Sequence, residues 1–460
     1  MLKRLFPSGA GVLALLALVT PVAAQEPPAP ASAEEIQALR DEVRALEAQV
    51  RSLMDRLAAL AAQPPETAPA TTAAASTAPP GAVPAAPVAP AAPTRSQNLM
   101  NPAISAVFQA IGSTSLRRQD EANGFDLSEA EIAFQSVVDP YAKMDLFLSF
   151  PAGETPEVEE ASVSTLSLPA SLQLKGGRFK NAFGKWNTLH THAFFTVDRP
   201  DALMNFFGEE SLTTDGISLS VLIPNPWDLY LESTTEAGTA LGGISFNDAH
   251  GDWTGLQRFS AFFNTTPNST VEVGLSGAWG KAGPSETTLR EIEEAGVSGT
   301  LRPRDALDSA VAGLDVTWKW KPLRQNTYRS FVWQTELLRS RRDVDLLVPA
   351  PLPELEPPAL RPDTISSLGG YSYLEWQFAR RWRGGLRYDR SGFPDSETDR
   401  EQSAVAVVRF QPSEFQELRF QIKQTRRNES AALRFGADEE DTRIYFEWIP
   451  VIGAHGAHKY

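Results

Sequence analysis

Residues 142–150 read Ala-Lys-Met-Asp-Leu-Phe-Leu-Ser-Phe, and apolar and polar side chains alternate along this stretch. The apolar side holds Ala142, Met144, Leu146, Leu148 and Phe150, and the polar side holds Lys143, Asp145 and Ser149. A period of two is typical of a β-strand with one apolar and one polar face. The same pattern recurs toward the end of the chain, for example at 130–135, 315–320, 373–378, 417–423 and 443–448.

This alternation suits either a sheet with one wet face or a barrel in lipid with a polar lumen. Three features favour the barrel. Trp and Phe gather near segment ends, the polar faces carry charges of both signs, and the chain ends on Tyr460 after a last alternating segment, as in bacterial outer-membrane proteins. A soluble sandwich or propeller is the alternative.

About sixteen candidate strands can be counted. They begin near residues 104, 128, 141, 158, 171, 216, 227, 256, 270, 309, 328, 370, 382, 402, 416 and 442. An even number suits a bacterial barrel with both ends in the periplasm, and an aqueous lumen appears at about sixteen strands. We therefore expect an all-β fold, a transmembrane antiparallel β-barrel of about 16 strands over residues 97–460.

The N-terminal part of the chain differs in sequence pattern and composition. Lys3 and Arg4 precede a short apolar run, so residues 1–24 are expected to be a removable signal peptide. A leader (25–33) precedes a predicted coiled coil (34–60), and a Pro/Ala-rich linker (61–96) follows. The heptad positions predict oligomerisation, as a dimer or a trimer, through Ile36, Leu39, Val43, Leu46, Val50, Leu53, Leu57 and Leu60.

Composition restricts the function classes. The formal charge of −15 argues against binding to nucleic acid, which rewards basic patches. The chain has no cysteine, so it has no disulfide framework. It lacks a GxSxG elbow, an HExxH pair, a Walker loop and a GxGxxG with an acidic partner, so we expect no enzyme.

Long hydrophilic connections fall at 180–215, 236–255, 281–308 and 339–369, and each follows an odd-numbered strand. They are therefore expected on the outer side of the membrane. The 180–215 loop joins the fifth and sixth strands. In sixteen-stranded porins that loop commonly folds into the lumen, so it is expected to form a constriction here.

Charged side chains on the polar faces are candidates for the pore lining. They are Lys143, Asp145, Glu272, Lys319, Glu336, Glu375, Arg383, Arg387, Arg419 and Lys423. Positive side chains cluster in the last five strands, which would favour anions. A charge-paired wall without strong selectivity is the alternative, and we favour it.

The five histidines are the sharpest local signal. His190 and His192 form an HxH in the 180–215 loop, His455 and His458 lie close together near the end of the chain, and His250 stands alone. Neutral imidazole is a good zinc ligand, and acidic neighbours such as Asp198, Glu209 and Glu210 could complete a shell. Simple solvated or hydrogen-bonded loop histidines are the alternative for each.

Two family resemblances follow from short motifs. The layout with Gly177-Arg178-Phe179-Lys180 and Phe183-Gly184 resembles the phosphate-selective porin family. A closer match is to zinc-regulated outer-membrane receptors, often called TonB-dependent, through Leu174–Phe179, Asn187–His192, Val197–Pro200, Gln411–Phe415, Leu418–Phe420 and Gly453–His458. This resemblance covers most of residues 101–460. It implies an envelope role connected to zinc, with His190, His192, His455 and His458 on the family's marked positions. Gated receptors close a barrel of roughly 22 strands around a folded plug. Residues 97–460 are expected to form only about 16 strands, so the barrel is expected to be porin-like in size.

Together these observations predict a porin-like channel in the bacterial outer membrane, with a periplasmic N-terminal stalk. Small solutes would diffuse through a polar lumen narrowed by the 180–215 loop, with zinc as a weakly bound substrate and no required cofactor. The alternatives are an envelope anchor whose coiled coil engages a periplasmic partner, and an anion-selective porin. Expected partners are outer-membrane lipid, further copies of the chain, and the barrel-assembly machinery through the C-terminal strand.

Overall fold

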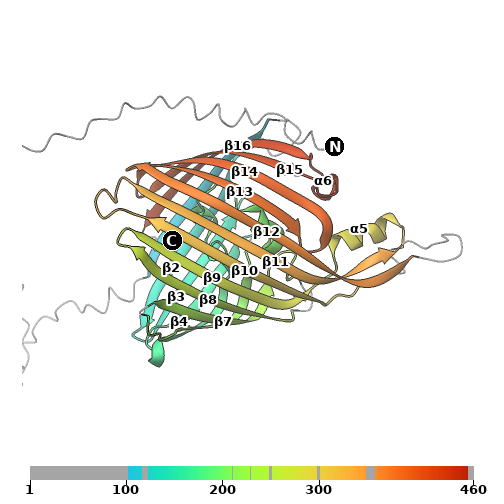
Figure 1. Ribbon diagram of the computed structural model, residues 1–460, viewed down its shortest axis with the longest axis horizontal. Helices are drawn as coiled ribbons and strands as arrows, with labels where there is room; N and C mark the ends of the chain where they lie inside the picture. The colour runs from blue at the N-terminus through green and yellow to red at the C-terminus, as the bar shows by residue number, and fades with distance from the viewer. Residues whose placement is uncertain are drawn as a thin grey trace, which may run out of the picture. The chain divides into compact units, whose positions relative to one another are not determined.

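The computed structural model describes residues 102–116, 123–209, 211–227, 229–247, 251–297, 301–348 and 358–453. Within these residues sixteen strands pair antiparallel with their sequence neighbours, and β1 pairs with β16 to close a barrel (Figure 1). The strands are β1 (Ala103–Ser115), β2 (Gly124–Asp139), β3 (Ala142–Pro151), β4 (Glu157–Thr165), β5 (Leu172–Lys180), β6 (Thr213–Leu222), β7 (Tyr230–Leu241), β8 (Trp253–Thr266), β9 (Ser269–Ala282), β10 (Leu307–Trp320), β11 (Ser330–Val348), β12 (Ala359–Ala379), β13 (Trp382–Phe393), β14 (Ser396–Ser413), β15 (Gln416–Arg427) and β16 (Glu440–Gly453). The predicted barrel of about 16 strands is confirmed. The predicted signal peptide, coiled coil and linker lie outside the described residues.

Short helices lie in the connections between strands. They are η1 (Pro169–Ser171), η2 (Thr191–Ala193), α4 (Asp201–Phe207), α5 (Glu286–Glu294) and α6 (Glu429–Phe435). No helix among the described residues is long and apolar enough to cross a membrane.

The outward side of the barrel carries an exposed apolar band. On β3, for example, Met144 and Phe150 are exposed, and on β12 Leu374 and Trp376 are exposed. Inward neighbours on the same strands are polar or buried, as the alternation predicts. A closed barrel leaves no unpaired strand edge, so every strand can lie in lipid with its backbone hydrogen-bonded.

The two ends of the barrel differ. At one end, where β1 begins and β16 ends, the connections include the tight turns 140–141, 267–268, 380–381 and 414–415. At the other end lie the long connections 181–212, 242–252 and 283–306, together with α5 and α6. We call these the turn end and the loop end. The prediction that the long connections follow odd-numbered strands is confirmed for these three.

The predicted connection at 339–369 is wrong. β11 and β12 continue past the apolar band and stay paired as far as Val348 and Ala359. Beyond the band the outward side chains become polar, as at Arg339 and Arg341, so the alternation of apolar and polar residues disappears although the hydrogen-bonded ladder continues.

Candidate functional site

The segment 181–212, which we call the inner loop, lies inside the barrel. Its backbone and side chains bond to strands around most of the circumference. Asn181 donates to Glu236 on β7 (2.7 Å), the Trp186 N–H donates to Glu336 on β11 (3.1 Å), and the Val197 N–H donates to Gln421 on β15 (2.8 Å). Only a segment within a closed barrel can reach such separated strands at once. The predicted entry of this loop into the lumen is confirmed.

The inner loop brings an apolar core into the lumen. The core consists of Phe183, Trp186, Leu189, Ala193, Phe194, Ala202, Leu203, Phe206, Phe207 and Leu212 of the loop, packed on Ala240, Phe246, Leu256, Ala278, Val311, Leu338, Tyr371, Tyr373 and Val407. Trp186 packs edge-on against Tyr371, with ring centroids 5.9 Å apart, and Phe195 stacks on Tyr373 at 5.4 Å. We expected a constriction here, and the loop side chains packed on the wall form it as an apolar plug.

One glycine makes a key turn of the plug possible. Gly184 has a φ of +59°, and a Cβ atom there would lie 2.0 Å from Glu336 Oε2. The absence of a side chain therefore lets the next two N–H groups, of Lys185 and Trp186, donate to Glu336 Oε1 at 2.9 and 3.1 Å. This turn fixes the inner loop to β11.

Buried inward side chains occur on all sixteen described strands. They include Gln109, Glu131, Ser149, Ser162, Lys180, Thr214, Glu236, Arg258, Ser276, Asp315, Glu336, Tyr373, Arg387, Arg409, Arg419 and Glu447. A water-filled channel of porin width would expose wall side chains along its length. The burial indicates that the inner loop and the wall side chains occupy most of the lumen in this conformation.

The predicted pore-lining residues fall into two groups. Lys143, Asp145, Glu272, Lys319 and Arg383 lie toward the turn end and remain partly exposed to water. Glu336, Glu375, Arg387, Arg419 and Lys423 face inward as expected, but the inner loop or their ion-pair partners cover them, so they line no open water. The second group holds the plug rather than a pore.

The positive side chains of the last strands form what we call the basic wall: Arg387 on β13, Arg409 on β14, and Arg419 and Lys423 on β15. Each is ion-paired. Lys423 contacts Asp198 (2.6 Å) and Asp201 (2.5 Å) of the inner loop, and Arg387 contacts Asp198 (2.9 Å). Arg409 and Arg419 share Glu417, both at 2.7 Å. The favoured alternative, a charge-paired wall, fits this arrangement better than an anion-selective ladder.

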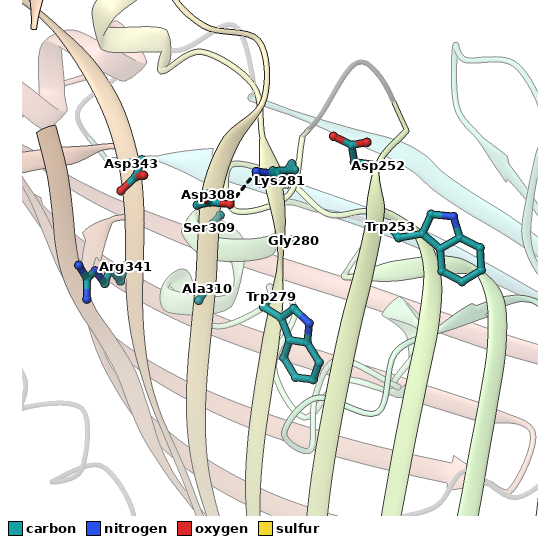
Figure 2. Close-up of a pocket in the computed structure, with 10 residues that line it drawn as sticks. All are labelled: Asp252, Trp253, Trp279, Gly280, Lys281, Asp308, Ser309, Ala310, Arg341 and Asp343. Carbon is teal, nitrogen blue, oxygen red and sulfur yellow. Dashed lines mark hydrogen bonds and ion pairs between the residues drawn. The ribbon is translucent and has the colours of Figure 1, made fainter. Parts of the chain in front are cut away.

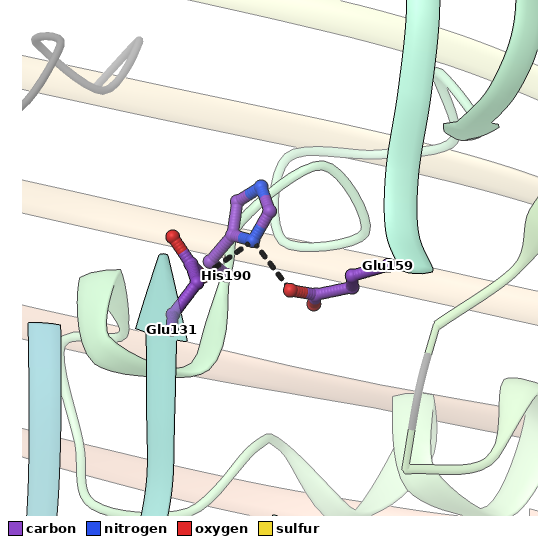
Figure 3. A group of neighbouring side chains, drawn as sticks. All are labelled: Glu131, Glu159 and His190. Carbon is purple, nitrogen blue, oxygen red and sulfur yellow. Dashed lines mark hydrogen bonds and ion pairs between the residues drawn. The ribbon is translucent and has the colours of Figure 1, made fainter. Parts of the chain in front are cut away.

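His190 lies on the other charged part of the wall, which we call the acidic wall: Glu129 and Glu131 on β2 with Glu159 and Glu160 on β4. Its Nδ1 lies 2.9 Å from Glu159 and 3.0 Å from Glu131 (Figure 3). Its Nε2 lies 2.9 Å from Glu160. His192 Nδ1 lies 3.4 Å from Glu131, and the two imidazole rings stack with centroids 5.8 Å apart. One imidazole is therefore surrounded by three carboxylates.

An irregularity in β4 explains why two consecutive glutamates reach one histidine. Phe147 pairs with Glu160 and Leu148 pairs with Val158, so Glu159 is an extra residue in the ladder. A β-bulge of this kind re-aims side chains that would otherwise point to opposite faces. This geometry is invisible in the sequence pattern, which is why these carboxylates were missed as candidates.

The surroundings of His190 favour its protonated form. Burial alone would lower the pKa of His190, but the negative charge of Glu159 and the hydrogen bonds with Glu131 and Glu159 outweigh both burial and the nearby Lys180. The pKa of this imidazole is thus raised well above its ordinary value, which favours the charged ring.

The same cluster has the donor atoms of a metal site. Ligand atoms of Glu131, Glu159 and His190 all lie within 4.8 Å of one another. Glu131 is 2 % exposed, and its Oε1 has no hydrogen-bond partner among the described residues. One imidazole with two or three carboxylates is a ligand set that zinc and similar divalent ions accept. A cation entering here would take over the charge that the proton on His190 now supplies.

The predicted ligands are only partly brought together. His190 and His192 are adjacent, as expected, but Asp198 belongs to the basic wall, where the charges of Arg387 and Lys423 outweigh burial and hold the pKa of its carboxyl well below the ordinary value. The backbone oxygen of Glu209 accepts from Arg199 at 3.3 Å. Glu210, His250, His455 and His458 lie outside the described residues.

Comparison with known proteins gives few relatives. No protein-family model matches the chain. An uncharacterized protein of Aquifex aeolicus (strain VF5) is 27% identical over 376 residues, which are 78% of this chain and 74% of that protein.

Several solved structures are similar in fold. An anion-selective porin from Comamonas acidovorans has a TM-score of 0.47 at 8% identity, covering 76% of this chain and 99% of that chain. A trimer form of in-vitro folded OmpT, an outer membrane protein of Vibrio cholerae, has a TM-score of 0.45 at 8% identity, with coverage of 76% and 99%. OprB of Pseudomonas putida at high pH has a TM-score of 0.44 at 9% identity, with coverage of 78% and 96%.

Proposed function

We propose that this chain is an outer-membrane channel whose lumen the inner loop closes, with divalent metal ions, zinc foremost, as its favoured solute. A closed barrel with an apolar outer band and a polar interior supports the membrane location. The single observation that carries the metal assignment is the buried cluster of Glu131, Glu159 and His190, where the inner loop meets the wall. The resemblance to zinc-regulated receptors marks one residue of this cluster, His190, together with His192, His455 and His458.

Passage of a solute requires the inner loop to move, because the loop and the buried wall side chains occupy most of the lumen. The two ends of the inner loop lie side by side, because Lys180 of β5 pairs with Thr213 of β6. The loop can therefore move while the strands of the barrel stay paired. A metal bound between His190 and the acidic wall would hold the loop against β2 and β4, so it would favour the closed conformation.

The test is the current through the refolded chain in planar bilayers. The full chain should show low conductance with brief openings. A variant in which residues 181–212 are replaced by a four-residue turn should conduct steadily, because a short turn suffices to join a paired position. Micromolar zinc should reduce the openings of the full chain and leave the loop-deleted variant unaffected.

Two substitutions separate metal binding from loop closure. His190→Ala with His192→Ala should abolish the effect of zinc on the current. Asn205→Ala on α4 is the matched control, because this buried loop residue contacts Glu401 (3.4 Å) on β14 rather than the acidic wall. Absence of current in both the full chain and the loop-deleted variant would refute the channel proposal.

An envelope anchor remains the second candidate, and the packed lumen favours it specifically, because an anchor needs no pore. In that case the stalk, residues 25–96, would engage a periplasmic partner and hold the copies of a dimer or trimer together. A full chain that never conducts under any metal concentration, although the loop-deleted variant does, would favour the anchor. Loss of phenotype on deletion of residues 25–96 would support it directly.

A further inference from the structure

A groove lies on the outer surface of the barrel at the loop end, away from the inner loop. It has a volume of about 520 Å³ and spans four neighbouring strands, β8 to β11 (Figure 2). Trp253 and Trp279 line the groove, and 71% and 52% of their surface is exposed. Exposed indoles at the rim of a barrel's apolar band are typical of the membrane–water interface.

The floor of the groove is made of small side chains. On β10 the outward residues Ala310 and Ala312 pair with Trp279 and Gly277 of β9. One step further from the rim, the register aligns three exposed leucines, Leu275, Leu314 and Leu337. The groove therefore lies between a charged rim and the apolar band, with Trp279 and Ala310 at its end toward the band.

Arg341 lines the other side of the groove, and Arg339 is the next outward residue of β11 toward the apolar band. Arg339 and Arg341 are outward residues of β11 that pair with Ala312 and Ala310. Both are exposed, and within the described residues neither has an ion-pair or hydrogen-bond partner. Two guanidinium groups beside an apolar floor match a phosphate group linked to acyl chains.

Two of the three aspartates that line the groove, Asp308 and Asp343, are already engaged. Asp308 is paired with Lys281 at 2.7 Å, as Figure 2 shows, and Asp343 accepts a hydrogen bond from Thr364 at 2.8 Å. They lie two residues further toward the loop end than Ala310 and Arg341, which pair with each other. Arg339 and Arg341 are therefore the positively charged side chains that remain available to bind an anion near Trp279.

We propose that this groove is a binding site for a phosphorylated lipid of the outer leaflet. An acyl chain lies on the floor of Gly277, Ala310 and Ala312 against Trp279, and the phosphate lies at Arg339 and Arg341. The loop end of such barrels faces the cell exterior, so the lipid comes from that leaflet. This site is independent of the inner loop and of the metal cluster.

The test measures lipid retention by the full chain in phosphatidylcholine nanodiscs that contain either lipid A or dephosphorylated lipid A, by native mass spectrometry. The wild-type chain should retain the phosphorylated form selectively. Arg339→Gln with Arg341→Gln should weaken retention about 30-fold, or about fivefold for each arginine. Arg390→Gln is the matched control, because Arg390 is an exposed outward residue of β13 without a partner among the described residues, and it should change nothing.

A second variant probes the floor without touching the charges. Ala310→Trp should fill the groove and lower retention of lipid A while leaving circular dichroism unchanged. Equal retention of both lipids, an equal loss in Arg390→Gln, or cross-linking through Trp279 to a second copy of the chain in place of lipid would overturn the proposal.

Discussion

The acidic wall and the basic wall both hold the inner loop with buried charges, but they divide the charges in opposite ways. On the basic wall the barrel supplies permanent cations, Arg387 and Lys423, and the loop supplies the carboxylates of Asp198 and Asp201. On the acidic wall the barrel supplies carboxylates and the loop supplies an imidazole. An arginine or lysine stays charged at neutral pH, whereas an imidazole can lose its proton or bind a metal. The attachment of the loop to the basic wall is thus permanent, whereas its attachment to the acidic wall depends on the proton or metal bound by the imidazole.

The two walls also differ in how completely their buried polar atoms are hydrogen-bonded. Asp198 accepts from Arg387, Gln421 and Lys423, which are distributed over two strands. Glu131 keeps an unpartnered oxygen among the described residues. A buried carboxylate oxygen without a partner costs free energy unless a ligand uses it. The acidic wall is therefore the one of the two that can still bind a ligand.

The largest expected effect comes from breaking the basic wall. Arg387→Met with Lys423→Met would leave Asp198 and Asp201 buried without their cations, which costs roughly 3–5 kcal/mol for a buried pair that loses one partner. The loop should then leave the wall, and the channel should conduct without any ligand. Bilayer current gives the readout, and urea titration in micelles gives the loss in unfolding free energy.

A charge-restoring variant serves as the control for that result. Adding Asp198→Asn and Asp201→Asn to the double substitution removes the stranded carboxylates, so part of the lost stability should return. A double substitution that leaves both stability and conductance unchanged would contradict the role of the basic wall as the permanent attachment.

A smaller loss is expected at the acidic wall. His190→Gln removes one cation that bonds to Glu159, Glu160 and Glu131, but Lys180 stays ion-paired with Glu159. Loss of charged hydrogen bonds of this kind costs roughly 1.5–3 kcal/mol. More frequent openings in bilayer recordings, with the barrel still folded by circular dichroism, would agree. Openings as frequent as in the basic-wall variant would erase the difference between the walls.

The sequence predicted the barrel well because period-two alternation reports directly which face of a strand meets lipid. It also placed the inner loop in the lumen and His190 beside His192. It missed the partners of His190, because the bulge at Glu159 depends on pairing between β3 and β4 that no local pattern encodes. It placed Asp198 near the histidines because they are close in the chain, whereas in space the loop carries them to different parts of the wall.

Glu131→Gln should weaken zinc binding far more than it changes stability. Because Glu131 is buried and only partly paired, replacing its carboxylate by a neutral amide should change the unfolding free energy by less than about 1 kcal/mol. Zinc affinity should nevertheless fall by roughly 100-fold, since an amide is a poor zinc ligand. Isothermal titration with zinc measures this loss. Glu232→Gln is the control, because this carboxylate on β7 accepts from Tyr230 (2.9 Å) away from the cluster. Undiminished zinc binding would remove Glu131 from the site.

Raising the pH should produce the smallest effect, through His190 at the acidic wall. The pKa of His190 is raised in the folded chain, so its ion pairs with Glu131, Glu159 and Glu160 contribute fully below the unfolded value of about 6.5 and are lost as pH rises through the folded value. Lys180 of β5 faces the same carboxylates and donates to the backbone oxygen of Leu189 at 3.4 Å, so part of the attachment of the loop remains. Opening frequency in zinc-free bilayers should therefore increase as the solution becomes more alkaline, and His190→Gln should show a flat profile. Since zinc binds the neutral imidazole, its affinity should rise over the same range. An increase in opening on acidification would show that a group other than His190 controls the loop, and the acidic wall would then be as permanent an attachment as the basic one.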